Sequence, residues 1–361
     1  AVLPGQGKVV LMCGRCRNSA MALQLAFQEY GIGAVFAAAL PAHAEVALGQ
    51  VAAGLLGAHE SRWNLMMPLE THETAWEPRD CQVALSVELD AAEVMGSDGV
   101  PRRDSSRFVV LDGLFGEEER SELLDMITAP GWDHGSGAPP SPKWTRETVD
   151  ASDLPRSWGL GQEDLESMVE APSRAMKEVQ SRICKLYPEY KISLMPSHAT
   201  EGTAAGGDED LCPFVGNAAV YGDCFQWHLD ADPSNFPPGP WVDRHGLYVN
   251  REAGKPLFAT LLLYLDAEWE MQWDAETLFL DNETGAGVFV RPRGLRAVLM
   301  DQDVPHRLST PSQLAGRPRY SLVWKLVLHP KSPAAPSSIA RPGWPPALRF
   351  GSAGPYPHPA A

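Results

Sequence analysis

Residues 257–269, LFATLLLYLDAEW, belong to a series of short apolar stretches separated by turn residues, and this series decides the fold. The other members are NAAVYGDCFQWHLDAD (217–232), ETLFLD (276–281), GVFVRP (287–292), RAVLMDQDVPHRL (296–308) and RYSLVWKLVL (319–328). Short strands at this spacing, with turns between them, are typical of β-sandwiches and barrels. The chain after about residue 211 therefore predicts a β-sandwich or an open barrel of jelly-roll type, with helices packed outside.

The regions around this series predict an α+β protein with three parts. Residues 1–100 begin with a strand, helix and strand pattern and form a small N-terminal α/β region. The polar stretch 95–106 is expected to connect this region to the main domain, residues 101–330. That domain opens with a strand and carries a helix with an acidic first turn, GEEERSELLDMI, and a second helix near 163–187. Residues 331–361 are rich in proline and predict a tail that has no core of its own and lies against the body.

The composition excludes several classes of protein. The 361 residues are 44% hydrophobic and 21% charged, which excludes a wholly disordered or collagen-like chain. The formal net charge of -16 opposes loose binding to nucleic acid and to anionic membranes. We find neither a long uninterrupted apolar run nor a signal peptide, so we expect a soluble protein. The six cysteines are irregularly spaced and favour a reducing compartment, so we expect the cytoplasm.

A pattern of metal ligands lies within the strand-rich half. His228 and Asp230 are two residues apart in FQWHLDADP, so on a strand both side chains point to the same face. A second histidine, His306, follows at the end of another expected strand. Two imidazoles and one carboxylate on one face of an octahedral ion leave three positions open, as in non-haem Fe(II) sites. Zinc more often takes a closed or single-opening tetrahedral site, and oxygen ligands alone favour magnesium or calcium.

A candidate anion site follows the second histidine. Arg319 and Ser321 alternate with apolar residues on the strand RYSLVWKLVL. An arginine at the closed end of a barrel can hold a carboxylate in a bidentate pair, and a serine hydroxyl can add a third hydrogen bond. This fits 2-oxoglutarate, whose distal carboxylate needs an anchor while its keto acid end chelates iron. An H-x-D pair alone is weak evidence, whereas the ordered set of H-x-D, distant histidine and R-x-S is specific.

These motifs resemble those of the Fe(II)/2-oxoglutarate-dependent dioxygenases, and within them the prolyl-hydroxylase-like branch, over residues 107–330. The stretch 217–232 is similar to the family's strand with a tyrosine and H-x-D, and LLLYLDAEW is similar to its Tyr-Leu-Asn-x-x-Trp strand. PHRLSTPS and RYSLVWKL resemble its distal histidine and co-substrate arginine. The resemblance implies a double-stranded β-helix, with O2 and 2-oxoglutarate as co-substrates and ascorbate as a candidate reductant.

The resemblance also implies roles for individual residues. His228, Asp230 and His306 would bind iron, and Arg319 would pair with the distal carboxylate of 2-oxoglutarate. The hydroxyl of Tyr264 would donate to the same carboxylate, and Tyr221 would line the co-substrate pocket near the iron. The chain departs from the family pattern at WDAET (273–277), where a Gly-Gly pair is frequent, at Asp266, which replaces an asparagine, and at an insertion, QLAGRP. These changes border the open face and leave the substrate undecided.

Other candidate residues are weaker. The proline- and glycine-containing stretch 231–256 predicts a lid over the site, with candidate substrate contacts at Trp241, Arg244, His245 and Tyr248. Three neighbouring arginines are expected on a solvated face: Arg291, Arg293 and Arg296. Cys13 and Cys16 form a CxxC between an expected strand and helix, loosely like a glutaredoxin. An inert structural pair is the default interpretation of these cysteines.

Three functions stay open at this point. The leading one is oxidation of a C–H bond of a small molecule or of a peptidyl residue such as proline. The fold does not choose among hydroxylation, desaturation, epoxidation and ring formation. A second is oxidation of a flipped nucleobase, which the net charge opposes. A third is a non-catalytic binding or scaffold protein, which the intact set of expected ligands opposes.

Overall fold

The computed structural model describes residues 68–95, 99–128, 143–149, 154–195, 213–223, 225–236 and 240–350. Its contacts divide the chain into Ala1–Ser61 and Arg62–Ala361, and every described residue belongs to the second unit. The strand, helix and strand expected near the N-terminus, with Cys13 and Cys16, lie outside the described residues. None of the helices in these ranges combines the length and the apolar character needed to cross a membrane.

A large sheet of ten strands forms the framework. Its order is β13-β1-β2-β10-β7-β12-β6-β4-β3, with β5 paired to β12. These strands are β1 (Gln82–Met95), β2 (Pro101–Asp112), β3 (Trp144–Val149), β4 (Leu154–Leu160), β5 (Tyr190–Leu194), β6 (Phe214–Ala219), β7 (Leu257–Tyr264), β10 (Arg296–Asp301), β12 (Arg319–Pro330) and β13 (Leu348–Arg349). The central strands β2, β10, β7, β12 and β6 all pair antiparallel.

A small sheet of three strands faces the large one. Its order is β11-β8-β9, formed by β8 (Thr277–Leu280), β9 (Gly287–Val290) and β11 (His306–Leu308). His228 adds an antiparallel bridge on the free side of β11. From β6 onward the chain therefore passes back and forth between the sheets: β6, the bridge at His228, β7, β8 and β9, β10, β11, β12. This alternation is that of a double-stranded β-helix, which confirms the predicted jelly-roll core.

The alternation of side chains along β7 explains the two layers of core. All eight residues of this strand are buried. Leu261 and Leu263 join a core cluster that includes the flanking helices, whereas Leu262 and Tyr264 join a cluster between the two sheets. Successive side chains point to opposite faces, so an uninterrupted apolar strand must be covered on both sides.

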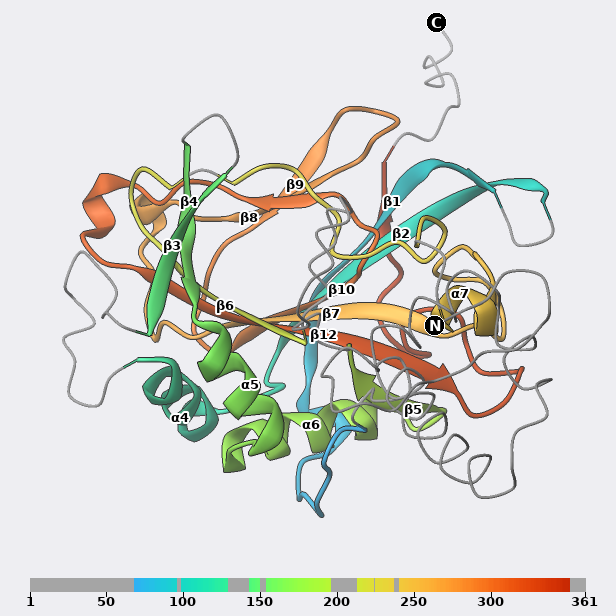
Figure 1. Ribbon diagram of the computed structural model, residues 1–361, viewed down its shortest axis with the longest axis horizontal. Helices are drawn as coiled ribbons and strands as arrows, with labels where there is room; N and C mark the ends of the chain where they lie inside the picture. Colours follow the sequence, from blue (N-terminus) through green and yellow to red (C-terminus); the bar gives the residue numbers. More distant parts are fainter. Residues whose placement is uncertain are drawn as a thin grey trace, which may run out of the picture. The chain divides into compact units, whose positions relative to one another are not determined.

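Helices cover the outer face of the large sheet. Figure 1 shows α4 (Glu117–Ile127), α5 (Gln162–Glu170) and α6 (Arg174–Leu186) on one side of it. The remaining helices among the described residues are α7 (Pro240–His245) and the 3-10 turns η1 (Pro78–Asp80), η3 (Met271–Trp273) and η4 (Gln313–Ala315). The acidic first turn expected of the first helix is that of α4, where three glutamates follow the N-cap.

The second helix expected near 163–187 is in fact two helices. α5 ends at Glu170, and α6 begins after Ser173, whose side chain accepts a hydrogen bond from the Met176 backbone N–H. Pro172 lies between them, and proline disfavours helical backbone at the residue before it. Proline and a capping serine together therefore end one helix and start the next.

Residues 95 and 101–106 of the stretch expected as a connector lie in the large sheet. β1 and β2 pair antiparallel, so residues 82–95 and 101–112, on the two sides of the expected domain boundary, belong to the same sheet. The polar residues of this stretch resemble a linker because β-strands place alternate residues on an exposed face. Residues 331–350 pack against the rest of the described chain. Ile339 is buried, its carbonyl accepts a bond from the Tyr187 hydroxyl, and β13 pairs with β1.

Candidate metal and co-substrate site

The side chains of His228, Asp230 and His306 converge on one point. One potential ligand atom of each lies within 4.8 Å of the others. The two histidines are paired across the small sheet, where each backbone N–H donates to the carbonyl of the other at 3.1 Å. The backbone N–H of Asp230 donates to the carbonyl of Gln302 at 2.8 Å. Backbone pairing therefore brings together ligands that lie far apart in the sequence.

Both imidazoles are held in the same orientation relative to their own backbone. Nδ1 of His228 lies 3.0 Å from the carbonyl oxygen of Gln226, and Nδ1 of His306 lies 2.9 Å from that of Val304. A carbonyl oxygen only accepts, so Nδ1 is the donor and Nε2 is the nitrogen left to face a metal. Burial lowers the pKa of His306 to about 4, which keeps this ring neutral near pH 7. Neutral imidazoles oriented through the other ring nitrogen are the form that binds metals.

The carboxylate of Asp230 has a partner at each oxygen. The Thr260 hydroxyl donates to Oδ2 at 2.6 Å, and Nζ of Lys325 lies 3.3 Å from Oδ1. Burial alone would raise the pKa of this carboxyl, but the ammonium of Lys325 and the hydrogen bond from Thr260 bring it well below its usual value. The carboxyl group of Asp230 is therefore charged at neutral pH.

Arg319 lies buried on the same face of β12 as Lys325. Its guanidinium donates to the Ser321 hydroxyl at 3.1 Å and to the Thr277 hydroxyl at 3.4 Å, and it stacks over the Tyr264 ring at 4.8 Å. Among the described residues, no carboxylate forms an ion pair with it and its Nε has no hydrogen-bond partner. Burial lowers the pKa of Arg319 because the charge is desolvated. A buried guanidinium in this state can accept an anion as its partner.

The tyrosines expected at the co-substrate differ in placement. The hydroxyl of Tyr264 lies 2.8 Å from that of Thr277, beside Arg319. Tyr221 lies in the turn after β6 and is 63% exposed. No described contact joins Tyr221 to the histidines or to Arg319, so only Tyr264 is beside the guanidinium.

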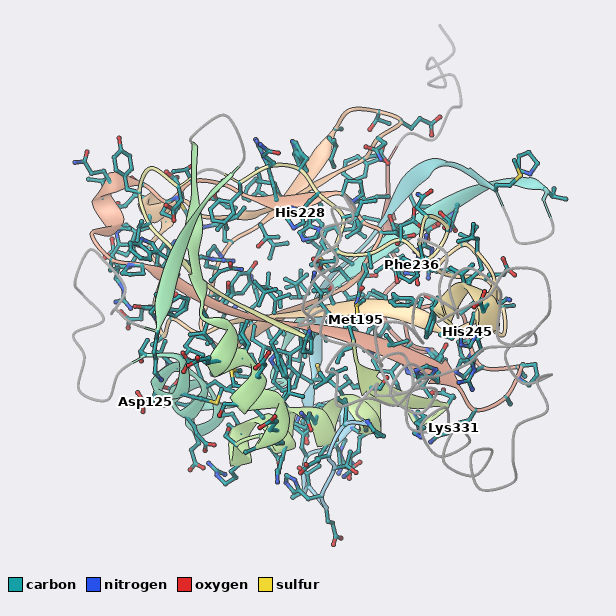
Figure 2. All side chains as sticks on the ribbon, viewed as in Figure 1. Asp125, Met195, His228, Phe236, His245 and Lys331 are labelled. Atoms are coloured by element: carbon teal, nitrogen blue, oxygen red, sulfur yellow. The ribbon has the colours of Figure 1, made fainter. Side chains whose placement is uncertain are left out.

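The site opens on the side of residues 226–229. All four are exposed, including His228, whereas His306 is 7% exposed. The guanidinium of Arg307 stacks on the exposed Trp227 ring at 5.0 Å. Figure 2 shows His228 between the strands of the small sheet and those of the large sheet. The three converging side chains are therefore exposed to solvent on the side of His228.

The candidate substrate contacts in 231–256 do not gather at this opening. Trp241 and Tyr248 are 2% and 0% exposed, in a cluster with Phe258, because aromatic side chains on a loop are stabilised by packing against the sheet. His245 stacks on Trp241 with ring centroids 4.3 Å apart, and Figure 2 shows it well apart from His228. Arg244 is exposed on the same helix. The stretch is therefore largely packed rather than an open lid.

The three arginines expected on a solvated face partly form ion pairs. Arg296 and Arg293 both contact Asp112, at 2.9 and 3.5 Å. Sequence reasoning did not single out three residues of the site: Thr260, Thr277 and Lys325. Thr277 is part of the WDAET stretch, and Lys325 is a charged residue in an apolar strand, a signal that could have been recognised.

Comparisons with known proteins give distant likenesses. No family model matches the chain, and no curated protein matches it. Among solved structures, a prolyl hydroxylase of Trichoplax adhaerens in complex with a hypoxia inducible factor peptide fragment has 14% identity and a TM-score of 0.34, covering 63% of this chain and 86% of that one. A Pseudomonas putida prolyl-4-hydroxylase has 12% identity and a TM-score of 0.31, covering 62% and 92%.

A third structure is HygX from Streptomyces hygroscopicus with nickel and 2-oxoglutarate bound. It has 12% identity and a TM-score of 0.29, covering 61% of this chain and 81% of that one. With TM-scores this low, the likenesses carry no conclusion about function, and the chemistry of the site rests on its own residues.

Proposed function

We propose that this protein is an Fe(II)- and 2-oxoglutarate-dependent dioxygenase that oxidises a C–H bond of a small molecule or of a peptidyl residue such as proline. One observation carries the proposal. Two imidazoles and a carboxylate converge inside a double-stranded β-helix that also holds a buried arginine with no carboxylate partner among the described residues. The first set suits a divalent metal, and the second suits an acid that would lie beside it.

The donor set fits iron better than the alternatives. His228 and His306 offer one Nε2 each and Asp230 offers one carboxylate oxygen, which is the two-histidine, one-carboxylate set of non-haem Fe(II) sites. A structural zinc site would need a fourth protein ligand, and no larger His, Cys, Asp and Glu group occurs among the described residues. When bound, iron and 2-oxoglutarate supply the oxidative chemistry: O2 is consumed, succinate and CO2 form, and one C–H bond of the substrate is oxidised.

The residues around Arg319 fit the distal carboxylate of 2-oxoglutarate. The guanidinium would pair with that carboxylate, while the hydroxyls of Tyr264, Thr277 and Ser321 lie close enough to one another or to the guanidinium to complete a polar end wall. All four residues are at most 4% exposed, so this end of the barrel excludes water. Exclusion of water strengthens the charge pair and limits side reactions.

The exposed edge of the site would be the side from which the substrate binds. Residues 226–229 form the exposed border beside the ligand His228, so the substrate would place its reacting C–H bond from this side. Tyr221, exposed in the preceding turn, would lie on the substrate side of the site rather than against the distal carboxylate. Specificity would then depend on exposed side chains such as Trp227 and Leu229, which are 40% and 43% exposed.

The test is turnover of 2-oxoglutarate by the purified, iron-loaded protein with a panel of candidate small molecules and proline-containing peptides. Stimulated succinate formation is expected with at least one member of the panel, and it should disappear in His228→Ala. His72→Ala is the matched control, because His72 binds Glu178 on α6 and should leave turnover unchanged. Turnover that persists in His228→Ala would refute this histidine as a ligand, and a non-catalytic scaffold would form no succinate in the wild type.

A further inference from the structure

Lys325 is a buried ammonium group inside the site. It lies on the face of β12 that also carries Arg319, Ser321 and Val323, because side chains alternate along the strand. The residue is 7% exposed, and its Nζ lies 3.3 Å from Oδ1 of Asp230. The neighbouring strand places Thr260 directly across from it in register.

These two partners fix the Asp230 carboxylate from opposite ends. Lys325 contacts Oδ1 and Thr260 donates to Oδ2, the oxygen that also lies 3.9 Å from Nε2 of His306. A carboxylate held at both oxygens cannot rotate freely about its last bond. Oδ2 therefore stays directed toward the histidines, and Oδ1 stays directed toward the ammonium.

The charges of the site do not balance with a metal alone. Asp230 is the one carboxylate among the three proposed ligands, and a histidine binds a metal through an uncharged ring nitrogen, so Asp230 supplies the one negative charge of the set. A divalent ion and the ammonium of Lys325 would then share that single carboxylate in a poorly solvated place, where like charges repel strongly. A dianionic co-ligand bound beside the metal would offset the excess positive charge.

We propose that Lys325 is a positioning residue that orients Asp230 and whose positive charge makes tight metal binding depend on the anionic co-substrate. The inference rests on the proposed function, because it takes 2-oxoglutarate as that co-substrate. Its consequence is thermodynamic coupling: the metal binds weakly by itself, and the keto acid increases metal affinity by as much as the metal increases keto acid affinity.

The experiment uses the full chain and Co(II), with calorimetric titration in the absence and presence of 2-oxoglutarate. Lys325→Met keeps most of the side-chain volume and removes the charge. It should bind Co(II) alone at least about tenfold more tightly than the wild type, and the enhancement by 2-oxoglutarate should fall by a similar factor. Lys325→Arg keeps the charge and should restore the wild-type pattern.

Lys331→Met is the matched control, since it removes an exposed ammonium outside the site, where Nζ donates to the carbonyl of Pro188. It should leave the enhancement by 2-oxoglutarate close to that of the wild type. Lys325→Gln also removes the charge but keeps a polar side chain. This variant replaces Lys325→Met in the titration if the methionine variant does not fold. Unchanged or weaker binding of Co(II) alone in the charge-removal variants would overturn the inference.

The result separates this inference from the proposed function. Loss of Co(II) binding in His228→Ala locates the metal at the three ligands. If the wild type binds Co(II) there but 2-oxoglutarate adds nothing, the proposed co-substrate is wrong. The affinity of the charge-removal variants for Co(II) alone still decides the role of Lys325 in that case.

Discussion

The guanidinium of Arg319 carries a charge that no carboxylate of the described residues offsets by direct contact. Replacing it with alanine removes the charged donor from a buried pocket, so Arg319→Ala should weaken binding of 2-oxoglutarate to the Co(II)-loaded protein by about 100-fold. Calorimetric titration measures this directly. Arg293→Ala is the control, because Arg293 is largely exposed and pairs with Asp112. Equal affinities in Arg319→Ala and the wild type would mean that another residue anchors the acid.

The turn at Asp274 and Ala275 has a backbone that favours glycine. Asp274 has φ 54 and ψ -134, and Ala275 has φ 63. Side chains with a Cβ cost about 1 kcal/mol or more in such conformations. This is the WDAET stretch, at the place where the resembling family often has glycine. The carbonyl of Asp274 accepts a bond from Trp269 Nε1, and Ala275 is fully buried, so packing of the turn holds the conformation.

Asp274→Gly should therefore stabilise the protein by about 1 kcal/mol, measured by urea unfolding. The side chain of Asp274 is exposed, so little is lost by removing it. Glu270→Gly is the control, because Glu270 has φ -70, where glycine brings no relief and adds freedom to the unfolded chain. A lower stability of Asp274→Gly than of the wild type would contradict the assignment of strain to this residue.

The sequence predicted those site residues that stand in short local motifs and missed those that do not. The H-x-D pair, the distant histidine and the R-x-S motif stand in local patterns, and the structure brings those side chains to the site. Thr260 and Lys325 come from two different strands, and they reach Asp230 because β7 and β12 pair in one register. A single sequence does not contain that register, so these contacts could not be predicted.

Among the elements, the break between α5 and α6 depends on one capping residue. Ser173 accepts a hydrogen bond from the Met176 backbone N–H at 3.3 Å. Ser173→Ala should cost about 1 kcal/mol, because one N–H of the first turn then loses its partner. Ser173→Asp keeps an acceptor and should recover most of the loss in thermal or urea unfolding. Equal stability of the alanine variant and the wild type would mean that Pro172 alone starts α6.

The strands that were predicted from the sequence are more buried than the strands that were missed. β7 and β12 are almost wholly buried and apolar, and both were recognised. Residues 95–106, where β1 ends and β2 begins, were taken for a connector, whereas the apolar second half of β2 was expected as the strand that opens the main domain. The β3–β4 hairpin has polar and charged residues along its strands and was taken for a polar stretch. The tertiary pairing of β2 with β10 holds β1 and β2 in the large sheet. Polar strands of this kind carry too little local signal to separate them from loops.

At the scale of the whole molecule, one buried arginine links the distant parts that hold the ligands. Arg251 follows the packed stretch 231–250 and forms ion pairs with Asp104 on β2 and with Asp301 and Asp303 around the β10–β11 turn. The same turn supplies the Gln302 and Val304 carbonyls that orient Asp230 and His306. The stretch expected as a lid is therefore tied at its end to the turn that positions the ligands.

Three histidines buried or half-buried in this framework make its stability depend on pH. Burial lowers the pKa of His245, His306 and His329 from the ordinary histidine value of about 6.5 to about 4 each. Between these two values the unfolded chain binds protons that the folded protein does not. The free energy of unfolding therefore falls as the pH decreases from about 6.5 to about 4. Above this range the three histidines are neutral in both states and their effect on stability no longer changes with pH.

His329 provides the variant that tests this dependence without touching the metal ligands. Its Nε2 lies 3.3 Å from the Ser193 hydroxyl, and a glutamine can keep that hydrogen bond but does not titrate. The shift at His329 corresponds to a loss of about 2 kcal/mol between pH 7 and pH 5. His329→Gln should therefore lose less stability over this interval than the wild type, by urea unfolding at the two pH values. Equal losses would mean that burial at His329 does not oppose its protonation, and the pH dependence would then come from His245 and His306.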